Sequence, residues 1–214
     1  VYKRQAAHGV RLVSDEVYHG ITYTDAQVAT AACFLDSGAI VVNSFSKYWA
    51  MTGWRLGWLI LPEDLAAPVA ALAGNFSLCP PTLAQHAGIA ALSPPGMAAA
   101  RKNVTDYAAA RDLLLARLPE LGWARVAPAD GAFYLYADVS ASGMDSITWC
   151  ARLLDEAGVA LTPGTDFDRV DGHRFVRVSF ASPLELVREA VDRIITWQQA
   201  LATQLGPIGG RLHA

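Results

Sequence analysis

A lysine and an arginine stand eight residues apart in a stretch that is rich in hydroxyl groups and glycine. The stretch covers residues 44–57 and reads Ser-Phe-Ser-Lys-Tyr-Trp-Ala-Met-Thr-Gly-Trp-Arg-Leu-Gly. The amine of Lys47 is a nucleophile that can form a Schiff base with an aldehyde. The hydroxyls of Ser44 and Ser46 and the guanidinium of Arg55 are donors of the kind that hold a phosphate. The spacing therefore predicts a cofactor site.

An apolar run precedes this stretch. Residues 39–43, Ala-Ile-Val-Val-Asn, are typical of a buried strand in a parallel sheet, so Lys47 is expected in the loop after its carboxyl end. Open α/β sheets bind ligands at that edge. The alternative is that Lys47 is an ordinary surface lysine and Arg55 a charge at the rim of the fold. The full spacing, as far as Gly57, favours the cofactor site.

The stretch resembles the pyridoxal-phosphate lysine signature of the class I/II aminotransferases, which are fold type I enzymes. The resemblance implies that Lys47 carries pyridoxal 5′-phosphate as a Schiff base and that Ser44, Ser46 and Arg55 anchor its phosphate. It covers nearly the whole chain but matches only the second half of such an enzyme. We therefore expect the chain to be an excerpt that lacks the first half of the cofactor site.

A second motif, Ser-Asp-Glu-Val-Tyr at residues 14–18, follows another apolar run and resembles the same family. By this resemblance Asp15 pairs with the protonated pyridine nitrogen, and Tyr18 donates its phenol to the 3-oxygen of the ring. A buried carboxylate would keep that nitrogen cationic, so that the ring can accept electrons. The alternatives are that Asp15 is a helix N-cap and Tyr18 an ordinary half-buried aromatic residue.

The third element is Phe-Val-Arg-Val-Ser-Phe-Ala at residues 175–181, whose alternation is typical of a strand with Arg177 at its centre. The resemblance implies that Arg177 binds the α-carboxylate of the substrate, for which a planar bidentate donor is suited. The alternative is a structural ion pair. Arg174 is the weaker candidate, because it stands where the strand begins. Residues 128–136 and 159–167 resemble segments that border the substrate pocket in the family, but they are equally explained as strand, core and turn.

The predicted fold class is α/β and similar to the pyridoxal-phosphate-dependent transferases. Residues 1–110 are expected to form part of a large, mainly parallel-sheet domain, 111–205 a small C-terminal α+β domain, and 206–214 a flexible tail. Strands are predicted near residues 10–15, 39–44, 55–61, 123–127, 132–139, 159–162 and 174–181. Helices are predicted over 62–75, 82–92, 97–118, 145–157 and 182–205.

Composition agrees with this interpretation without pointing to it. The chain has 214 residues, of which 53% are hydrophobic and 17% charged, and only three are lysines, Lys3, Lys47 and Lys102. The formal charge of −3 argues against a nucleic-acid-binding surface, and every apolar run is too short to cross a membrane. The three cysteines form no metal or redox motif, so we expect no metal site and a reducing, cytoplasmic location.

The predicted function is transfer of an amino group from an amino acid to a 2-oxo acid by a full-length protein that is a homodimer. Three rivals remain open. A pyridoxal-phosphate-dependent C–S β-lyase would use the same cofactor residues, and an acyl-transferring oxoamine synthase would keep the Ser-x-Ser-Lys core but fits Arg55 less well. The third is a non-catalytic sensor, in which an aminotransferase-like domain is fused behind a DNA-binding domain.

Overall fold

The computed structural model describes residues 2–24, 28–123 and 125–205, which divide into two compact units. Unit 1 comprises Val1–Val104 with Asp130–Ala132, and unit 2 comprises Thr105–Ala129 with Phe133–Ala214. The strands and the short 3₁₀ helices η1 and η4 are β1 Val13–Asp15, η1 Ala31–Ser37, β2 Ile40–Ser44, β3 Gly57–Ile60, β4 Tyr134–Asp138, β5 Thr162–Pro163, η4 Gly164–Asp166 and β6 Phe175–Ser179. The α-helices are α1 Tyr2–Ala7, α2 Glu63–Phe76, α3 Thr82–Ala91, α4 Pro94–Ala116, α5 Leu118–Leu121, α6 Ser146–Ala157 and α7 Leu184–Leu205.

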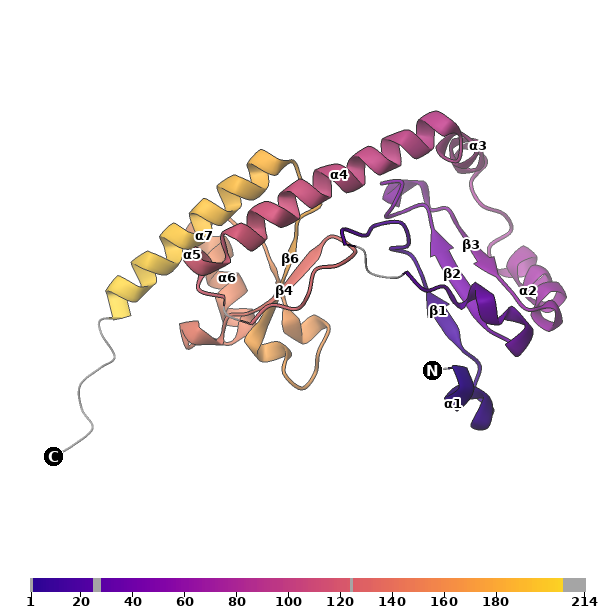
Figure 1. Ribbon diagram of the computed structural model, residues 1–214, viewed down its shortest axis with the longest axis horizontal. Helices are drawn as coiled ribbons and strands as arrows, with labels where there is room; N and C mark the ends of the chain where they lie inside the picture. The colour runs from indigo at the N-terminus through magenta and orange to yellow at the C-terminus, as the bar shows by residue number, and fades with distance from the viewer. Residues whose placement is uncertain (1, 25–27, 124, 206–214) are drawn as a thin grey trace. The chain divides into compact units, whose positions relative to one another are not determined.

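Unit 1 contains a three-stranded sheet in the order β1-β2-β3 (Figure 1). β1 pairs with β2 in parallel, and β3 pairs with β2 in antiparallel, with Gly57 opposite Ser44. A Cβ at Gly57 would lie 2.7 Å from the carbonyl oxygen of Asn43, so only glycine permits this close approach. The carboxyl ends of β1 and β2 and the start of β3 therefore share one edge of the sheet.

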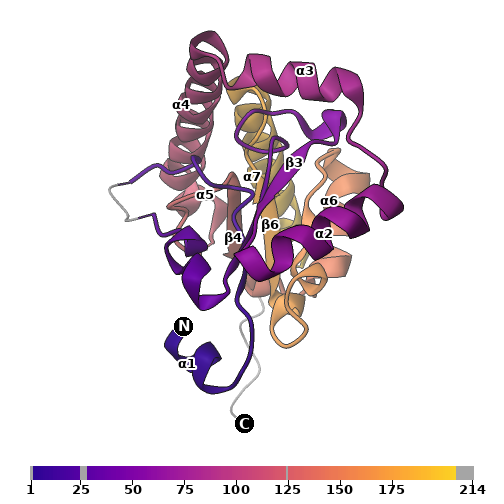
Figure 2. The ribbon, with the colours of Figure 1, turned by 90° about the vertical axis from the view of Figure 1, so that its right-hand side faces the viewer.

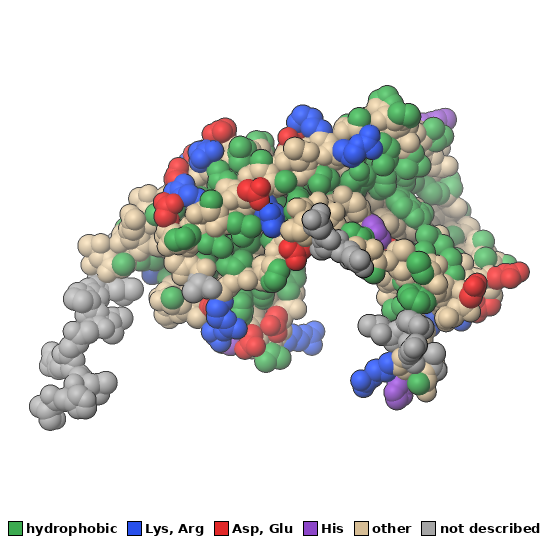
Figure 3. All heavy atoms as spheres, viewed as in Figure 1, with side chains coloured by type: hydrophobic (Ala, Val, Ile, Leu, Met, Phe, Trp, Pro, Cys, Tyr) green, Lys and Arg blue, Asp and Glu red, His purple; other side chains and the backbone are tan. Residues whose placement is uncertain are grey.

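One part of the core of unit 1 is a buried cluster of mostly small side chains, Ala31, Ala39 and Val41. Helix α2 runs alongside the sheet next to β3 (Figure 2) but buries none of its residues. Hydrophobic side chains are visible at the surface around α3 (Figure 3), and Phe76 at the end of α2 is 85% exposed. Unit 1 thus leaves much apolar surface uncovered by its own residues.

Unit 2 has the opposite character. Its antiparallel sheet has the order β4-β6-β5, and alternate residues on one face, among them Leu135 and Val176, are fully buried. Helices α6 and α7 contribute Trp149, Leu153 and other buried side chains to the same core. Asp145 caps the N-terminus of α6 by accepting the backbone N–H groups of Ile147 and Thr148, as a helix N-cap requires.

Several expected boundaries differ from the structure. The sheet is predicted to be mainly parallel, but β3 is antiparallel to β2, because the loop after β2 folds straight back and lets the N–H of Phe45 donate to the carbonyl of Leu56. The strand expected over 123–127 is a single bridge between Val126 and Ala137, and residue 124 lies outside the described residues. Helix α4 begins at Pro94 rather than after Gly96, since proline is accepted in the first helical turn. The boundary between the two units lies at residues 104 and 105, within α4, and the tail expected over 206–214 lies outside the described residues.

Candidate functional site

The first candidate residue, Asp15, is the last residue of β1. It lies opposite Val42 in the parallel ladder, two residues before Ser44 ends β2. Since both strands end at the same edge, the Asp15 carboxylate and the Ser44 hydroxyl lie on neighbouring strand ends. The Asp15 side chain is exposed, and its carboxylate accepts the N–H of Val17 at 3.2 Å, which turns the chain away from the strand.

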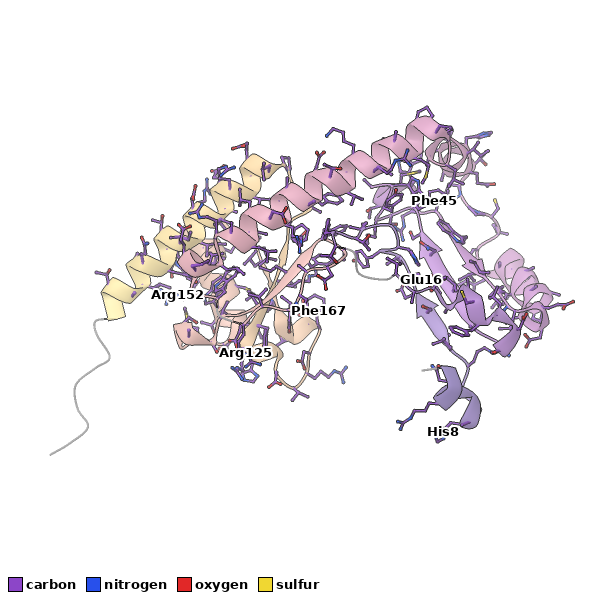
Figure 4. The ribbon with its side chains drawn as sticks, in the orientation of Figure 1. His8, Glu16, Phe45, Arg125, Arg152 and Phe167 are labelled. Carbon is purple, nitrogen blue, oxygen red and sulfur yellow. The ribbon has the colours of Figure 1, made fainter. Side chains whose placement is uncertain are left out.

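The Glu16 carboxylate fixes the segment that follows β1 (Figure 4). It accepts hydrogen bonds from Ser14 Oγ at 3.0 Å, Thr30 Oγ1 at 2.9 Å and the N–H of Ala31 at 2.8 Å, and lies 3.0 Å from His19 Nδ1. Burial raises the pKa of Glu16, but these hydrogen bonds and the charge of His19 lower it more, so the pKa lies below its ordinary value. An ionised, well-satisfied carboxylate therefore anchors this segment.

A chain of hydrogen bonds shapes the loop between β2 and β3. The Ser44 hydroxyl lies 2.9 Å from the Ser46 hydroxyl and accepts the N–H of Ser46 at 3.0 Å. The Thr52 hydroxyl donates to the Ser46 carbonyl at 2.8 Å, and Arg55 Nη1 donates to the Thr52 carbonyl at 2.9 Å. Arg55 has a φ of 53°, a left-handed conformation that is uncommon for a residue other than glycine and often marks functional sites. The loop thus brings three hydroxyls and a guanidinium into one hydrogen-bonded chain.

Lys47 lies beside Tyr18. The Nζ atom of Lys47 is 5.7 Å from the centroid of the Tyr18 ring, within the distance of a cation–π contact. The segment after β1 also contacts the lysine loop at Gly20. This residue has a φ of 92°, and a Cβ there would lie 2.7 Å from the Tyr48 ring. Only glycine meets both conditions, so this position locks the segment after β1 against the lysine loop.

Aromatic side chains support the lysine loop from within unit 1. The Phe45 ring (Figure 4) contacts the rings of Trp49 and Trp58 at centroid distances of 4.9 and 5.1 Å. Tyr48 contacts Trp49 at 4.8 Å in an edge-to-face arrangement. Such pairs add to the stability that burial provides. The backbone on both sides of Lys47 is therefore held by packing, in addition to the hydrogen bonds around Ser44 and Ser46.

The donor set of unit 1 fits pyridoxal phosphate by its chemistry. Ser44, Ser46 and Arg55 offer hydroxyls and a guanidinium for a phosphate, and Lys47 offers an amine for an aldehyde. Its neighbour Tyr18 has a phenol, which can donate to the 3-oxygen of the ring. On the adjoining strand end, Asp15 supplies a carboxylate that can pair with a protonated pyridine nitrogen.

Arg177, the remaining predicted residue, belongs to unit 2. It lies at the centre of β6, opposite Tyr136 in β4 and Thr162 in β5. Its guanidinium carbon lies 4.3 Å from the ring centroid of Tyr134 and 4.2 Å from that of Phe167. Its Nε atom is buried and has no hydrogen-bond partner, and no described carboxylate forms an ion pair with the side chain. The structural ion pair that was the alternative explanation for Arg177 is therefore absent from the described residues.

Sequence reasoning left four contributors unassigned, namely Glu16, Tyr48, Thr52 and Phe167. All four lie in or next to the quoted motifs. Thr52 binds within the lysine loop itself, whereas the other three have partners in other segments, for which spacing alone gave no signal. Within the described residues no group of three or more His, Cys, Asp or Glu is arranged to hold a metal ion. In the same part of the chain, no helix is long and apolar enough to span a bilayer.

Comparison with known proteins shows the family to which the chain belongs. The model of the family "Aminotransferase class I and II" matches residues 1–194. The chain is 51% identical over 191 residues to the valine–pyruvate aminotransferase of Mycobacterium tuberculosis, which covers 89% of this chain and 49% of that protein. It is 36% identical over 206 residues to the aspartate aminotransferase of Thermotoga maritima, covering 91% of this chain and 51% of that protein.

Solved structures give the same result for the fold. The crystal structure of an aminotransferase from Mycobacterium tuberculosis matches with a TM-score of 0.89 at 50% identity, covering 93% of this chain and 51% of that chain. A putative aminotransferase from Silicibacter pomeroyi matches with a TM-score of 0.87 at 44% identity, covering 92% of this chain and 52% of that one. The predicted α/β fold class is confirmed, and the chain spans about half the length of the relatives that it matches. The chain belongs to the class I and II aminotransferases.

Proposed function

We propose that the full-length protein, a chain that contains these residues and has the length of its relatives, is a transaminase. It transfers an amino group from an α-amino acid to a 2-oxo acid with pyridoxal 5′-phosphate as cofactor. The observation that carries this proposal is the 5.7 Å contact between Lys47 Nζ and the Tyr18 ring, next to the hydrogen-bonded Ser44, Ser46 and Arg55 loop. Family membership supports it, because this is a family of aminotransferases.

Each residue has a role in the proposal. The bound cofactor supplies an electron sink for the electrons that remain when the substrate loses its α-proton. Lys47 would hold the cofactor through its aldehyde and, once the substrate amine has displaced it, its free amine would move the proton between the substrate α-carbon and the cofactor C4′ as a general acid and base. Asp15 keeps the pyridine nitrogen protonated, and Tyr18 donates a hydrogen bond to the 3-oxygen.

Four further residues anchor the cofactor or the substrate in this proposal. Ser44, Ser46 and Arg55 bind the phosphate, for which hydroxyls and a guanidinium are strong donors. Arg177 binds the α-carboxylate, so that the amino acid is oriented as well as attracted. The absence of an ion pair with any described carboxylate supports this role.

The substrates proposed for a first test are valine and pyruvate. A relative that is 51% identical over 191 residues is a valine–pyruvate aminotransferase, whereas the aspartate aminotransferase is only 36% identical over 206 residues. A neutral amino acid needs one arginine for its α-carboxylate, and aspartate would need a second cation for its side chain. Aspartate is therefore the natural comparison substrate.

Two measurements test the proposal in the full-length protein loaded with cofactor. Borohydride reduction followed by peptide mapping should place a pyridoxyl group on Lys47 and on neither Lys3 nor Lys102. Mixing with valine in the absence of pyruvate should convert one equivalent of cofactor to pyridoxamine phosphate and release one equivalent of 2-oxo acid. Lys47→Ala is the matched control, which should give neither result.

The rival functions predict different outcomes. Release of pyruvate and ammonia from cysteine-type substrates would identify a C–S β-lyase. Labelling of Lys47 without turnover of any amino acid would support the sensor. Label on another lysine, or no label after saturation with cofactor, would contradict the proposal.

We also propose that the full-length protein is a cytoplasmic homodimer. Helices α2 and α3 carry exposed apolar side chains, among them Leu72, Phe76, Leu83 and Ile89, which would be unfavourable in a monomer. Cys33, Cys79 and Cys150 are free thiols, as is usual in a reducing compartment. Analytical ultracentrifugation of the full-length protein should give the mass of two chains, and a stable monomer would contradict this part of the proposal.

A further inference from the structure

Two aromatic rings lie against Arg177, although binding a substrate carboxylate requires only its guanidinium. Its guanidinium carbon lies over two aromatic rings, at 4.3 Å from the centroid of Tyr134 and 4.2 Å from that of Phe167. Two rings thus lie within cation–π distance of the planar group and restrict the directions from which a ligand can approach it.

The two rings arrive from different elements. Tyr134 lies in β4 opposite Ser179, and so is the diagonal neighbour of Arg177 across the β4–β6 ladder. Phe167 (labelled in Figure 4) directly follows η4, which itself follows β5. Its N–H donates to the carbonyl of Gly164 at 2.9 Å, which closes the turn that carries it.

Two glycines fix the position of that turn. A Cβ at Gly164 would lie 2.6 Å from the carbonyl oxygen of Gly172, and a Cβ at Gly172 would lie 2.5 Å from that of Gly164. Both residues are buried, so the two backbones pack directly against each other. The Thr-Pro-Gly segment at residues 162–164 is therefore more than a plain turn. The close packing of its glycine fixes the backbone position of the turn that carries Phe167 to Arg177.

The edge of the guanidinium that remains open can also be identified. Nε is buried without a hydrogen-bond partner. The two Nη atoms are not among the buried unpartnered atoms, and they make no hydrogen bond with a described residue. With two rings against the guanidinium and Nε enclosed, the Nη pair is the part of Arg177 that a carboxylate can reach.

We propose that Tyr134 and Phe167 form an aromatic clamp that holds the Arg177 side chain so that its two Nη atoms bind the substrate α-carboxylate end-on. The inference rests on the proposed function and deepens it by naming two positioning residues. The rings attract the guanidinium through cation–π contacts and restrict its rotamers, so less conformational entropy is lost when a carboxylate binds. They do not take part in proton transfer, and their effect is therefore on substrate binding.

The test compares variants that remove a ring with variants that keep it, in the full-length protein loaded with cofactor. Phe167→Leu and Tyr134→Leu should each raise KM for valine by about 2- to 30-fold, the range that one cation–π contact supplies, with kcat little changed. Phe167→Tyr and Tyr134→Phe keep the rings and should restore KM. Because Phe167 is 51% exposed, its loss should remove little from the core and leave the protein folded.

Phe175→Leu is the matched control. Phe175 lies in the same strand as Arg177 and stacks on Tyr136 at 4.9 Å with an interplanar angle of 5°, but it forms no contact with the guanidinium that the structure records. If the rings acted only through stability, this variant would raise KM as much as Phe167→Leu. A clamp predicts that it lowers the melting temperature and leaves KM unchanged.

A binding measurement separates the clamp from the proposed reaction. The probe is 3-methylbutanoate, which has the carbon skeleton of valine but no amino group to react, and its dissociation constant is measured by calorimetry. The constant should rise in Phe167→Leu and Tyr134→Leu by the same factor as KM and return in the ring-keeping variants. If both variants bind 3-methylbutanoate as the wild type does, or if the wild type does not bind it, the clamp is wrong even where valine is turned over. If valine is not turned over but the binding pattern holds, the proposed function fails and the clamp stands.

Discussion

The two units each contain a sheet of three strands, but they use it in different ways. In unit 2 the β4–β6 pair is sealed by helices, and Leu135 and Val176 are completely buried. In unit 1 the strands are short, Leu59 in β3 remains 47% exposed, and an open groove lined by apolar residues runs between α2 and strands β2 and β3. Unit 2 therefore has its own core, whereas unit 1 does not cover its sheet with its own residues.

The candidate residues follow this division. The cofactor candidates of unit 1 are held by hydrogen bonds within the lysine loop, from Ser44 to Arg55, and by the packing of Gly20 on Tyr48. Arg177 instead lies in the strand at the centre of a well-packed sheet. Substitutions at the first group should thus change chemistry more than stability, and substitutions in the core of unit 2 should do the reverse.

The largest expected effect is on chemistry, at Asp15. Asp15→Ala should leave the full-length protein folded and able to bind cofactor, because the side chain is exposed and accepts only the N–H of Val17 within the described residues. The half-reaction with valine should slow by roughly 10²- to 10⁴-fold, since the pyridine nitrogen loses the partner that keeps it protonated. Stopped-flow absorbance measures this rate, and Asp36→Ala at another exposed aspartate is the control. Near-normal turnover in Asp15→Ala would show that the pyridine partner is another residue.

The next effect is on stability, and it compares one leucine from each sheet. Leu135→Ala should lower the free energy of unfolding of the 214-residue chain by about 2–5 kcal/mol, because it opens a cavity in a closed core. Leu59→Ala should change it by less than about 0.5 kcal/mol, since the side chain is already in contact with water. Urea unfolding followed by tryptophan fluorescence measures both. Equal losses would mean that the sheet of unit 1 has a closed core after all.

Sequence patterns predict some of these features, such as strand positions, and miss others, such as strand direction. The alternation in residues 175–181 placed Arg177 in a strand, and the apolar run before Asn43 placed Lys47 after one, as β6 and β2 show. Both patterns are local, because the faces of a strand follow from a period of two residues. The antiparallel direction of β3 was not predicted, since it depends on how the loop of residues 45–56 folds back.

Contacts between distant segments were beyond the sequence patterns. Phe167 meets Arg177 because two glycines eight residues apart, Gly164 and Gly172, pack backbone against backbone. Glu16 takes donors from both sides of the segment that it anchors, Ser14 before it and Thr30 after it. No spacing rule encodes such contacts, because they depend on the path of the chain between the partners.

A smaller effect is expected when the charge of Arg177 is kept but its shape is changed. Arg177→Lys should raise KM for valine by about 10- to 100-fold, because the ammonium group cannot make the bidentate contact and is a poorer partner for the two rings. Cofactor binding, followed by the absorbance of the bound cofactor, should stay as in the wild type. Release of cofactor would instead place Arg177 at the phosphate, and unfolding would give it a structural role.

The smallest expected effect concerns Asp138, which lies at the end of β4 and is only 7% exposed. Burial raises the pKa of Asp138, but hydrogen bonds from Ser140 and the charges of Arg174 and Arg125 lower it more, so the folded-state pKa lies below the ordinary value. Arg174 Nη2 and Arg125 Nη1 lie 2.9 and 3.6 Å from its Oδ2 atom. Ionised Asp138 therefore stabilises unit 2 above the unfolded-state pKa of about 4, and this contribution is lost as the pH falls through the lowered folded-state value.

Asp138→Asn should accordingly lower the free energy of unfolding of the 214-residue chain by about 1–3 kcal/mol at pH 7. The difference from the wild type should shrink at pH 3, because the carboxyl of the unfolded chain is then protonated and the preference of the folded state for the ionised form stabilises it less. Urea unfolding at the two pH values measures this, and Asp155→Asn, at an exposed aspartate with no ion pair among the described residues, should show no such dependence. A difference that is the same at both pH values would mean that the Asp138 side chain stabilises unit 2 through its hydrogen bond to Ser140 and not through its charge.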